Sequence, residues 1–374
     1  MSSNINLTYI FSGGRKNRIE SNEIFAKDFF YGYFGIKNKD VKKQIIDIEH
    51  IKIPIVYYFD NLIKKIVNYP ISISSIFNNT FTNQIKNSDV IILVNESVMF
   101  FSLPYLYFLK KKNNNLKIAV FTMGLFANFS GNKYKKFFQE IIINNFCLKV
   151  VDNFLFLGNE EYKYAVKNYQ IRDSKFQYVA FGIDTQFWKN ANSYNLKNRK
   201  YILFIGNDHQ RDYEFVVQLA NELENYEFIF LTSKIHKNQI SKKNVKLING
   251  MWWSNKVSDF EIKNLYSNAM LTILPIKNSL QPSGQSVALQ SMSMGTPVLI
   301  TKTDGFWDYE KFEHQKEIIF LDENNIDLWR EAIDRLLAKP DLLKEISNNS
   351  KKIVNQNFNL TKFSSNIELF LDLK

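Results

Sequence analysis

The sequence predicts an α/β protein made of two Rossmann-like domains. Short apolar runs alternate with longer mixed segments along the whole chain, and this alternation starts afresh near the middle. A polar, asparagine-rich stretch, Lys189–Arg199, separates the two halves. Each run is short enough to be a buried parallel strand, and the segments between the runs suit crossover helices. Strands and helices that alternate in this way are typical of a doubly wound sheet.

The apolar runs give the expected strands. In the first half they are Asn6–Phe11, Ile53–Phe59, Val90–Val94, Leu116–Thr122, Phe154–Leu157 and Phe176–Phe181. In the second half they are Tyr201–Ile205, Glu227–Leu231, Val245–Ile248, Leu271–Pro275, Pro297–Thr301 and Glu317–Leu321. Tyr213–Leu223 and Asp259–Asn268 are examples of expected helices, and Leu360–Lys374 reads as a final amphipathic helix. We therefore expect domains at 1–190 and 191–355, followed by a terminal helical segment at 356–374.

Composition limits the classes of protein to consider. The 374 residues carry a formal net charge of +11, which favours anionic partners, although abundant lysine and asparagine also fit an AT-rich genome. The single cysteine, Cys147, excludes an intrachain disulfide and a Cys-rich zinc site. Neither a signal peptide nor an apolar stretch of about 20 residues is visible. We expect a cytoplasmic protein that either stays in solution or touches the membrane from that side.

The segment Leu271–Thr301 carries the strongest functional signal. A strand ending at Pro275 is followed by a polar loop, by Pro282-Ser283-Gly284-Gln285, and by a helix expected from about Ser286 to Met294. Gly295 is placed to end this helix, because glycine tolerates the left-handed conformation of a C-cap. A small-residue loop that opens a helix presents free N–H groups and a positive dipole end, where a diphosphate fits. An ordinary strand-loop-helix connection has the same pattern.

Residues 282–298, P-S-G-Q-S-V-A-L-Q-S-M-S-M-G-T-P-V, resemble the donor-binding core of glycosyltransferase family 4, also called glycosyl transferases group 1. That core reads roughly E-G-F-G-L-x-L-L-E-A-M-A-x-G-x-P-V. The resemblance is strongest from Val151 to the end of the chain. It includes the G-[VI]-D-x-x-x-F turn within Val151–Trp188, the strand and glycine of Tyr201–Gly206, and the helix Ser258–Asn268. The resemblance implies a GT-B fold, in which the last helix returns to the N-terminal domain.

The sequence also departs from this family. The two glutamates that the family places eight positions apart are replaced by Pro282 and Gln290. By resemblance, Gln290 is expected to contact the ribose as a neutral group, so Gln290→Glu should keep much of the nucleotide affinity. Asn207 stands where the family has an arginine, and Arg211 fills the later basic position. We therefore expect Arg211 to stabilise the leaving diphosphate, as the catalytic residue that the sequence supports best.

Further candidate residues lie outside this core. In the N-terminal half, Ser12-Gly13-Gly14-Arg15 follows the first strand and Thr122-Met123-Gly124 ends a later one. Trp252 follows the strand at 245–248, where it would either stack on a base or pack in the core. The complete set of expected donor-binding residues is Gly13, Gly14, Arg15, Gly124, Asn207, Arg211, Trp252, Ser283, Gly284, Gln285, Ser286 and Gln290. We name no general base, because Met123 stands where family members often have a histidine.

Two segments mix aromatic residues with lysines, which suits an anionic membrane surface. They are Phe100–Lys112 and Lys133–Phe138. The alternative is a buried aromatic face with solvated lysines. This alternative is favoured for Tyr105–Leu109, whereas neither interpretation is favoured over the other for Lys133–Phe138.

The resemblance implies a retaining hexosyltransferase without a metal or other cofactor. Its donor would be a nucleotide sugar bound to the C-terminal domain, and its acceptor a glycan or lipid-linked glycan in surface polysaccharide or glycolipid synthesis. The missing glutamates leave open a catalytically inactive GT-B protein that binds a glycan or takes part in surface assembly. A nucleic-acid-binding protein is suggested by charge alone, and no recognised nucleic-acid module appears.

Overall fold

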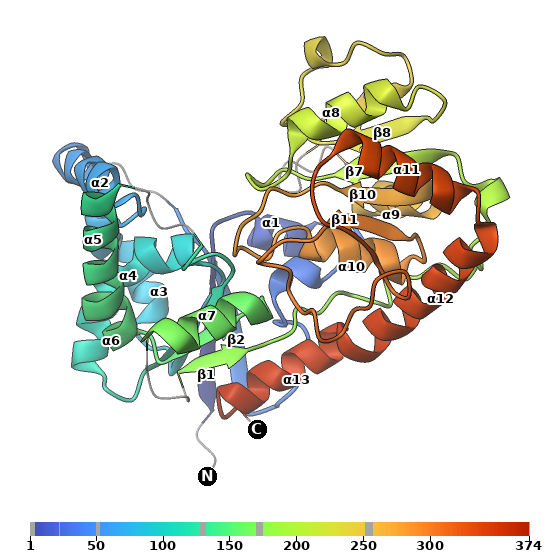
Figure 1. Cartoon of the computed structure of the whole chain (residues 1–374). Helices are drawn as coiled ribbons and strands as arrows, with labels where there is room; N and C mark the ends of the chain where they lie inside the picture. Colours follow the sequence, from blue (N-terminus) through green and yellow to red (C-terminus); the bar gives the residue numbers. More distant parts are fainter. Residues whose placement is uncertain are drawn as a thin grey trace. The chain divides into compact units, whose positions relative to one another are not determined.

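The protein is described here from a computed structural model that covers residues 4–21, 23–49, 53–127, 132–169, 175–250 and 257–373. The chain forms two compact units. Unit 1 comprises Met1–Glu23, Phe30–Val179 and Ser364–Lys374, and unit 2 comprises Ile24–Phe29 and Ala180–Phe363. Each unit is an α/β layer structure with helices packed around a central sheet (Figure 1).

Unit 1 contains a six-stranded sheet in the order β2-β1-β3-β4-β5-β6, in which every neighbouring pair is parallel. Its strands are β1 (Ile5–Phe11), β2 (Val41–Asp47), β3 (Val90–Leu93), β4 (Lys117–Thr122), β5 (Asn153–Phe156) and β6 (Phe176–Tyr178). The central strands β3 and β4 are almost wholly apolar and buried, because helices cover both faces of such a sheet.

The helices of unit 1 connect these strands. They are α1 (Arg15–Glu20), α2 (Pro54–Val67), α3 (Asn79–Ile85), α4 (Glu96–Lys112), α5 (Lys133–Ile142), α6 (Leu148–Val150) and α7 (Asn159–Tyr169). Short turns of helix occur at η2 (Ile73–Phe77) and η3 (Ile143–Cys147), and η1 (Asp28–Phe30) lies where the chain passes from unit 2 back to unit 1. Helices α2 and α5 lie side by side at one edge of this unit (Figure 1).

Unit 2 repeats the architecture with a six-stranded parallel sheet in the order β12-β11-β10-β7-β8-β9. Its strands are β7 (Tyr201–Ile205), β8 (Phe228–Leu231), β9 (Val245–Ile248), β10 (Ala269–Leu274), β11 (Val298–Thr301) and β12 (Ile319–Leu321). The chain runs outward in one direction from β7 to β9 and then restarts at β10 on the other side of β7. The switch point of this sheet therefore lies between β7 and β10, where ligands bind in doubly wound folds.

The helices of unit 2 are α8 (Tyr213–Glu222), α9 (Asp259–Asn268), α10 (Gln285–Ser293), α11 (Ile326–Leu337) and α12 (Pro340–Asn357). Short turns occur at η4 (Leu196–Asn198) and η5 (Lys237–Gln239). The last helix, α13 (Leu360–Phe370), starts in unit 2, and its part from Ser364 onward belongs to unit 1. The core of unit 2 is formed by apolar residues of β7, β8, β10 and β11 together with α8, α11 and α12.

Several expected elements are confirmed. Helix α9 has the predicted bounds, and α10 starts one residue before the predicted Ser286. Gly295, two residues after the end of α10, has a φ of +74°, which is the left-handed conformation predicted for the residue that ends this helix. None of the helices in the described part of the chain combines the length and the apolar composition that a membrane crossing requires.

The prediction of a strand at Ile53–Phe59 is wrong, because helix α2 begins at Pro54. Pro54 occupies the first turn of that helix, where its missing N–H costs no hydrogen bond. The strand that occupies this place in the sheet is β2, which the sequence analysis missed. Its pattern is mostly polar, with Val41 and Ile46 as its buried residues, because β2 is an edge strand.

The division of the chain also differs from the expected one. The main change of unit falls between Val179 and Ala180, before the polar stretch Lys189–Arg199. In addition, the short N-terminal segment Ile24–Phe29 belongs to unit 2. The segment is anchored by hydrogen bonds to side chains that lie far away in sequence: the Ala26 N–H donates to Asp259 Oδ2 at 2.8 Å. Local composition could not reveal this anchoring.

Candidate functional site

The switch point of unit 2 brings together the loops that follow β7 and β10. Gly206 comes directly after β7, and Arg211 forms an isolated antiparallel bridge with Ile276, which follows β10. The Asp212 N–H donates to the Pro275 carbonyl at 2.9 Å, so the two loops are joined by main-chain bonds. The fold thus positions Arg211 at the carboxyl edge of the sheet.

The side chain of Arg211 is 2% exposed and lies against the backbone of Gly206. A Cβ at Gly206 would come within 2.7 Å of Arg211 Nε, so only glycine allows this path. Arg211 Nη1 donates to Asp208 Oδ2 at 2.8 Å. Arg211 Nε is buried and has no hydrogen-bond partner among the residues that the structure describes. A buried guanidinium with an unused donor is suited to bind an anion.

The N-terminus of α10 lies beside this guanidinium. Gly284 is the N-cap residue, has a φ of +84°, and offers no side-chain oxygen to the first turn. An ideal Cβ at Gly284 would lie 3.6 Å from Arg211 Nη1, which places the helix start next to Arg211. The hydroxyl of Ser283 is buried and, within the described part of the chain, has no partner. The positive end of the α10 dipole therefore reinforces the positive potential of Arg211.

A cavity of about 180 Å³ opens onto this region. It is lined by Phe29, Ile205, Gly206, Asn207, Asp208, Arg211, Leu231, Gly250, Val257, Ile262, Tyr266, Ser286, Val287 and Gln290. Four of the expected donor-binding residues thus line a single cavity: Asn207, Arg211, Ser286 and Gln290. Of the other expected residues nearby, Ser283, Gly284 and Gln285 form the turn at the start of α10. Trp252 lies outside the described residues.

The Asn207 side chain joins two neighbouring loops. Its amide donates to the Gly250 carbonyl at 2.9 Å, and its oxygen accepts from the N–H of Ser233 at 2.7 Å and from the Ser233 hydroxyl at 2.9 Å. Asn207 therefore shapes the wall of the cavity. An arginine at this position would be unable to accept the two bonds from Ser233.

Gln290 takes part in a buried polar network. Its Nε2 donates to Asp28 Oδ2 at 2.7 Å, and its Oε1 accepts from the Tyr266 hydroxyl at 3.1 Å. Asp28 Oδ2 also accepts from the Trp188 indole at 2.6 Å, and Asp28 Oδ1 accepts from the Asp184 N–H. The amide of Gln290 is thus held by protein partners on both its oxygen and its nitrogen, while its side chain lines the cavity.

Asp28 is the main residue that the sequence analysis missed. It belongs to the segment Ile24–Phe29 and is completely buried in unit 2. Burial raises the pKa of Asp28 to about 7, although hydrogen bonds from Asp184, Gln290 and Trp188 oppose this shift. All of these partners are distant in sequence, so no local motif indicates the role of Asp28.

The expected residues of unit 1 form a separate group at the end of β1. Gly13 and Gly14 have φ values of +141° and +79°, and Gly14 is the N-cap of α1. Arg15 Nη1 donates to the Gly13 carbonyl at 3.0 Å, and its guanidinium lies over the Phe11 ring at 5.2 Å. Burial lowers the pKa of Arg15. The glycine pair therefore forms a tight turn that folds Arg15 back on β1.

Gly124 lies in a loop that two buried glutamates hold in place. Its N–H donates to Glu161 Oε2 at 2.8 Å, and the Phe126 N–H donates to Glu161 Oε1 at 2.9 Å. The N–H of Met123 donates to Glu96. Burial raises the pKa of Glu96 to about 7 and that of Glu161 to about 8. Neither glutamate was predicted, because the sequences of the helices that contain them show no functional motif.

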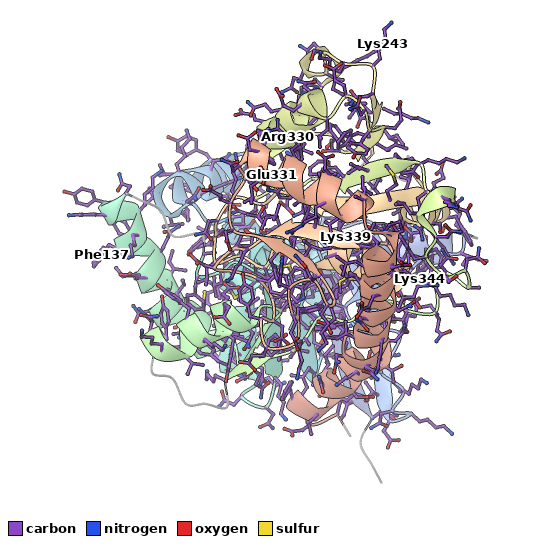
Figure 2. The ribbon with its side chains drawn as sticks, turned by 45° about the vertical axis from the view of Figure 1, so that its right-hand side comes forward. Phe137, Lys243, Arg330, Glu331, Lys339 and Lys344 are labelled. Carbon is purple, nitrogen blue, oxygen red and sulfur yellow. The ribbon has the colours of Figure 1, made fainter. Side chains whose placement is uncertain are left out.

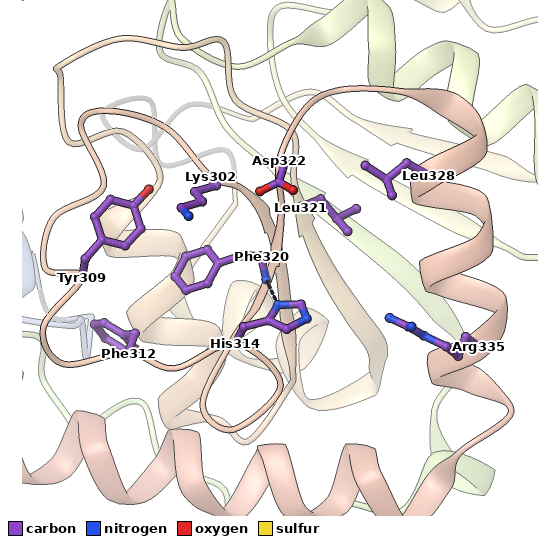
Figure 3. Close-up of a pocket in the computed structure, with 9 residues that line it drawn as sticks. All are labelled: Lys302, Tyr309, Phe312, His314, Phe320, Leu321, Asp322, Leu328 and Arg335. Carbon is purple, nitrogen blue, oxygen red and sulfur yellow. Dashed lines mark hydrogen bonds between the residues drawn. The ribbon is translucent and has the colours of Figure 1, made fainter.

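A second hollow, of about 500 Å³, lies on the β12 side of unit 2 (Figure 3). It is lined by Lys302, Tyr309, Phe312, His314, Phe320, Leu321, Asp322, Leu328 and Arg335. His314 Nδ1 accepts from the Phe320 N–H at 3.1 Å, which orients the ring. Lys302, His314 and Arg335 are exposed, so this hollow is open to solvent, and none of its residues was predicted to be functional.

The two aromatic and basic segments differ in burial. In α4, Leu106 and Leu109 are buried but Phe108 is exposed, so the core interpretation of Tyr105–Leu109 holds only in part. In α5, Tyr134, Phe137 and Phe138 are exposed among lysines.

Comparison with known proteins supports the family resemblance in the C-terminal half. Residues 184–353 match the family model described as glycosyl transferases group 1. The matched region spans β7 to β12 and includes Arg211, the α10 turn and the cavity. No curated protein matches the chain significantly in sequence.

Similar solved structures show the class of fold. Anabaena HepE in complex with UDP-glucose aligns with a TM-score of 0.69 at 11% identity, over 99% of this chain and 100% of that chain. Sucrose-phosphate synthase from Thermosynechococcus elongatus aligns with a TM-score of 0.68 at 12% identity, covering 99% of each chain. A glycosyltransferase from Rickettsia africae has a TM-score of 0.64 at 14% identity, covering 99% of this chain and 98% of that one. The fold of this chain is therefore GT-B, with two parallel-sheet α/β units.

Proposed function

We propose that this chain is a retaining glycosyltransferase that moves a hexosyl group from a nucleotide sugar to a glycan or lipid-linked acceptor. The observation that carries the proposal is the juxtaposition in unit 2 of the buried Arg211 guanidinium with the uncapped start of α10. Both groups lie in the region that matches glycosyl transferases group 1. HepE and sucrose-phosphate synthase have the same fold, and HepE binds UDP and UDP-glucose.

In the proposed reaction, the diphosphate of the donor sits between Arg211 and the first turn of α10. Arg211 and the N–H groups of the first turn of α10 stabilise the negative charge that grows on the diphosphate as the glycosidic bond to the sugar breaks. Charge stabilisation by these groups requires neither a metal nor another cofactor. The remaining catalysis is positioning of donor and acceptor, and the sugar keeps its anomeric configuration.

The proposed setting is the synthesis of surface polysaccharide or glycolipid. The protein would act in the cytoplasm, at the inner face of the membrane when the acceptor is lipid-linked.

The experiment is a panel of nucleotide sugars, beginning with UDP-glucose. Binding is read by thermal shift, because a ligand that binds only the folded state raises the melting temperature. Turnover is read by release of UDP, with and without candidate acceptors, and the anomeric configuration of the product by NMR. Saturation by one donor followed by transfer with retention supports the proposal. If no nucleotide sugar or free nucleotide binds the folded protein, the proposal is wrong.

A second candidate is a catalytically inactive GT-B protein that binds a glycan. The network around Gln290 favours it, because the amide at the position of a family glutamate is engaged by Asp28 and Tyr266. Pro282 also stands at the other glutamate position. Binding of a nucleotide sugar without hydrolysis or transfer to any acceptor would support this second candidate.

A further inference from the structure

Helix α2 in unit 1 presents apolar side chains to solvent as well as to the unit. Its side facing the unit carries Asp60, which is buried and accepts hydrogen bonds from the Ile73 N–H at 2.6 Å and from the Ser74 hydroxyl at 2.6 Å. Ser72 donates to the same carboxylate at 3.1 Å. Val67, seven residues after Asp60, is buried on the same side, so a polar cluster and apolar contacts together anchor this helix.

The outward side of α2 is apolar. Ile55, Phe59, Leu62 and Ile66 follow one another at spacings of four, three and four residues, so they form one stripe along the helix. All four side chains are exposed, and Ile55 is 75% exposed. Tyr58 lies beside this stripe and is 68% exposed.

The neighbouring helix α5 also exposes aromatic side chains. Its buried residue is Gln139, whereas Tyr134 is 80% exposed and Phe137 is 59% exposed. Phe137 projects outward from the end of the unit in Figure 2. Two adjacent helices thus present aromatic and aliphatic side chains to solvent on one surface, which we call the α2–α5 face. A contiguous exposed apolar surface of this kind marks a binding surface.

Lysines border the α2–α5 face. Lys64, Lys65 and Lys135 line a hollow of about 690 Å³ between the two helices, together with Tyr58, Asn61, Leu62 and Asn68. Lys133 and Lys136 add further positive charge on α5. Of the acidic residues in these helices, Asp60 is buried and Glu140 lies 4.0 Å from Lys136. The face is therefore both apolar and strongly cationic.

We propose that the α2–α5 face docks on an anionic lipid bilayer. Aromatic and aliphatic side chains would enter the interface between headgroups and acyl chains, and the lysines would meet the negative headgroups. A second copy of this chain fits less well, because a symmetric dimer through this face would bring the same lysines of both copies together. The proposal does not depend on the donor site, since every residue that carries it belongs to unit 1.

The test is co-sedimentation of the full chain with vesicles, either of phosphatidylcholine alone or with about one third phosphatidylglycerol. We expect binding to the anionic vesicles only, and weaker binding as salt increases. Lys64→Gln combined with Lys65→Gln should reduce the partition coefficient roughly tenfold to thirtyfold, because each lysine near the surface contributes about a fivefold factor. The matched control is Lys339→Gln combined with Lys344→Gln, on the exposed surface of unit 2 (Figure 2), which should leave binding unchanged.

The apolar contribution is tested by Ile55→Ser and Phe137→Ser, with Leu369→Ser as the control at another exposed apolar position. Both face variants should lose vesicle binding and still bind a nucleotide as the wild type does. Equal binding of wild type and face variants, or equal binding to neutral and anionic vesicles, would overturn the proposal. So would concentration-dependent self-association that Ile55→Ser abolishes, because a second copy would then cover the face. If the wild-type chain binds anionic vesicles as expected but binds no nucleotide, only the proposed function is contradicted.

Discussion

Arg211 reaches the cavity of unit 2 only because Gly206 lacks a side chain. Its guanidinium is held by Asp208, leaves Nε without a partner among the described residues, and lies next to the first turn of α10. Main-chain hydrogen bonds hold the loops around Arg211 in place. Substituting Arg211 therefore removes a positive charge from a site that is already formed.

We expect Arg211→Ala to weaken binding of the nucleotide by about 1.5–3 kcal/mol, because a charge-assisted hydrogen bond to the diphosphate is lost. Isothermal titration calorimetry with UDP measures this change. Arg330→Ala is the matched control: Arg330 forms a similar pair with Asp327 at 2.6 Å, at the same spacing of three residues but on the exposed surface (Figure 2). Equal affinity of both variants for the nucleotide would remove Arg211 from the site.

The network of Asp28 and Gln290 changes what a glutamate at position 290 is expected to do. By family resemblance, Gln290→Glu restores a usual residue and should keep nucleotide binding. In the structure, the new carboxylate would face Asp28 Oδ2, which lies 2.7 Å from the present amide nitrogen. Two buried carboxylates at this distance cannot both be ionised without a large cost.

We therefore predict that Gln290→Glu lowers the free energy of unfolding by about 1–3 kcal/mol at neutral pH. The folded variant must keep a proton that the unfolded chain releases, so the loss should grow as the pH rises through about 7, the raised pKa of Asp28. Urea denaturation at acidic and slightly alkaline pH measures it. Adding Asp28→Asn should recover part of the loss, and a loss that is independent of pH and of Asp28 would contradict this explanation.

At the scale of elements, the loop after β4 is held by side chains of two helices. Glu161 in α7 accepts from the main chain of Gly124 and Phe126, and Glu96 in α4 accepts from that of Met123. Because the folded-state pKa values are raised to about 8 and 7, both glutamates bind protons more tightly in the folded chain. Their contribution to stability is fully present below their ordinary pKa values, and it is lost as the pH rises through the folded ones.

Glu161→Gln should flatten the pH profile of stability between about pH 5 and 8, by at most about 1.4 kcal/mol per pH unit. It should also lower stability at acidic pH, since an amide has one oxygen to accept the two N–H groups. Chemical denaturation across this range provides the measurement. Glu160→Gln serves as control, because Glu160 pairs with Lys163 instead of the loop. Parallel profiles for Glu161→Gln and the wild type would refute the assignment.

At the scale of the whole molecule, the two proposed sites lie in different units. The candidate donor site lies in unit 2, and the α2–α5 face lies in unit 1. Ligand binding should therefore stabilise the chain unevenly, with most of the effect close to the cavity at the switch point.

We predict that UDP protects amides near Gly206–Arg211 and at the start of α10 from hydrogen exchange, with little change in strands β1 to β6. A ligand at a hundred times its dissociation constant stabilises the folded state by about 2.7 kcal/mol, which is ample for detection. Exchange followed by mass spectrometry would resolve the peptides. Protection confined to unit 1 would contradict the donor site proposed here.

Local patterns in the sequence determined the α/β class, most of the strands and the two-part organisation, because buried parallel strands must be short and apolar wherever they occur. They also determined the end of α10 at Gly295 and pointed to Arg211, since both depend on residues near each other in the chain. By contrast, Val41–Asp47 became a strand and Ile53–Phe59 did not, because an edge strand can be polar and Pro54 suits a helix start.

Only the tertiary structure decided the partners of Gln290, the burial of Asp28 and the exposure of apolar side chains on α2 and α5. Asp28 and Gln290 are 262 residues apart, and no local pattern encodes a contact over such a separation. Apolar residues occur on two sides of α2, and periodicity does not say which side meets the protein. That choice depends on Asp60 and its hydroxyl partners Ser72 and Ser74, which become neighbours only when the chain has folded.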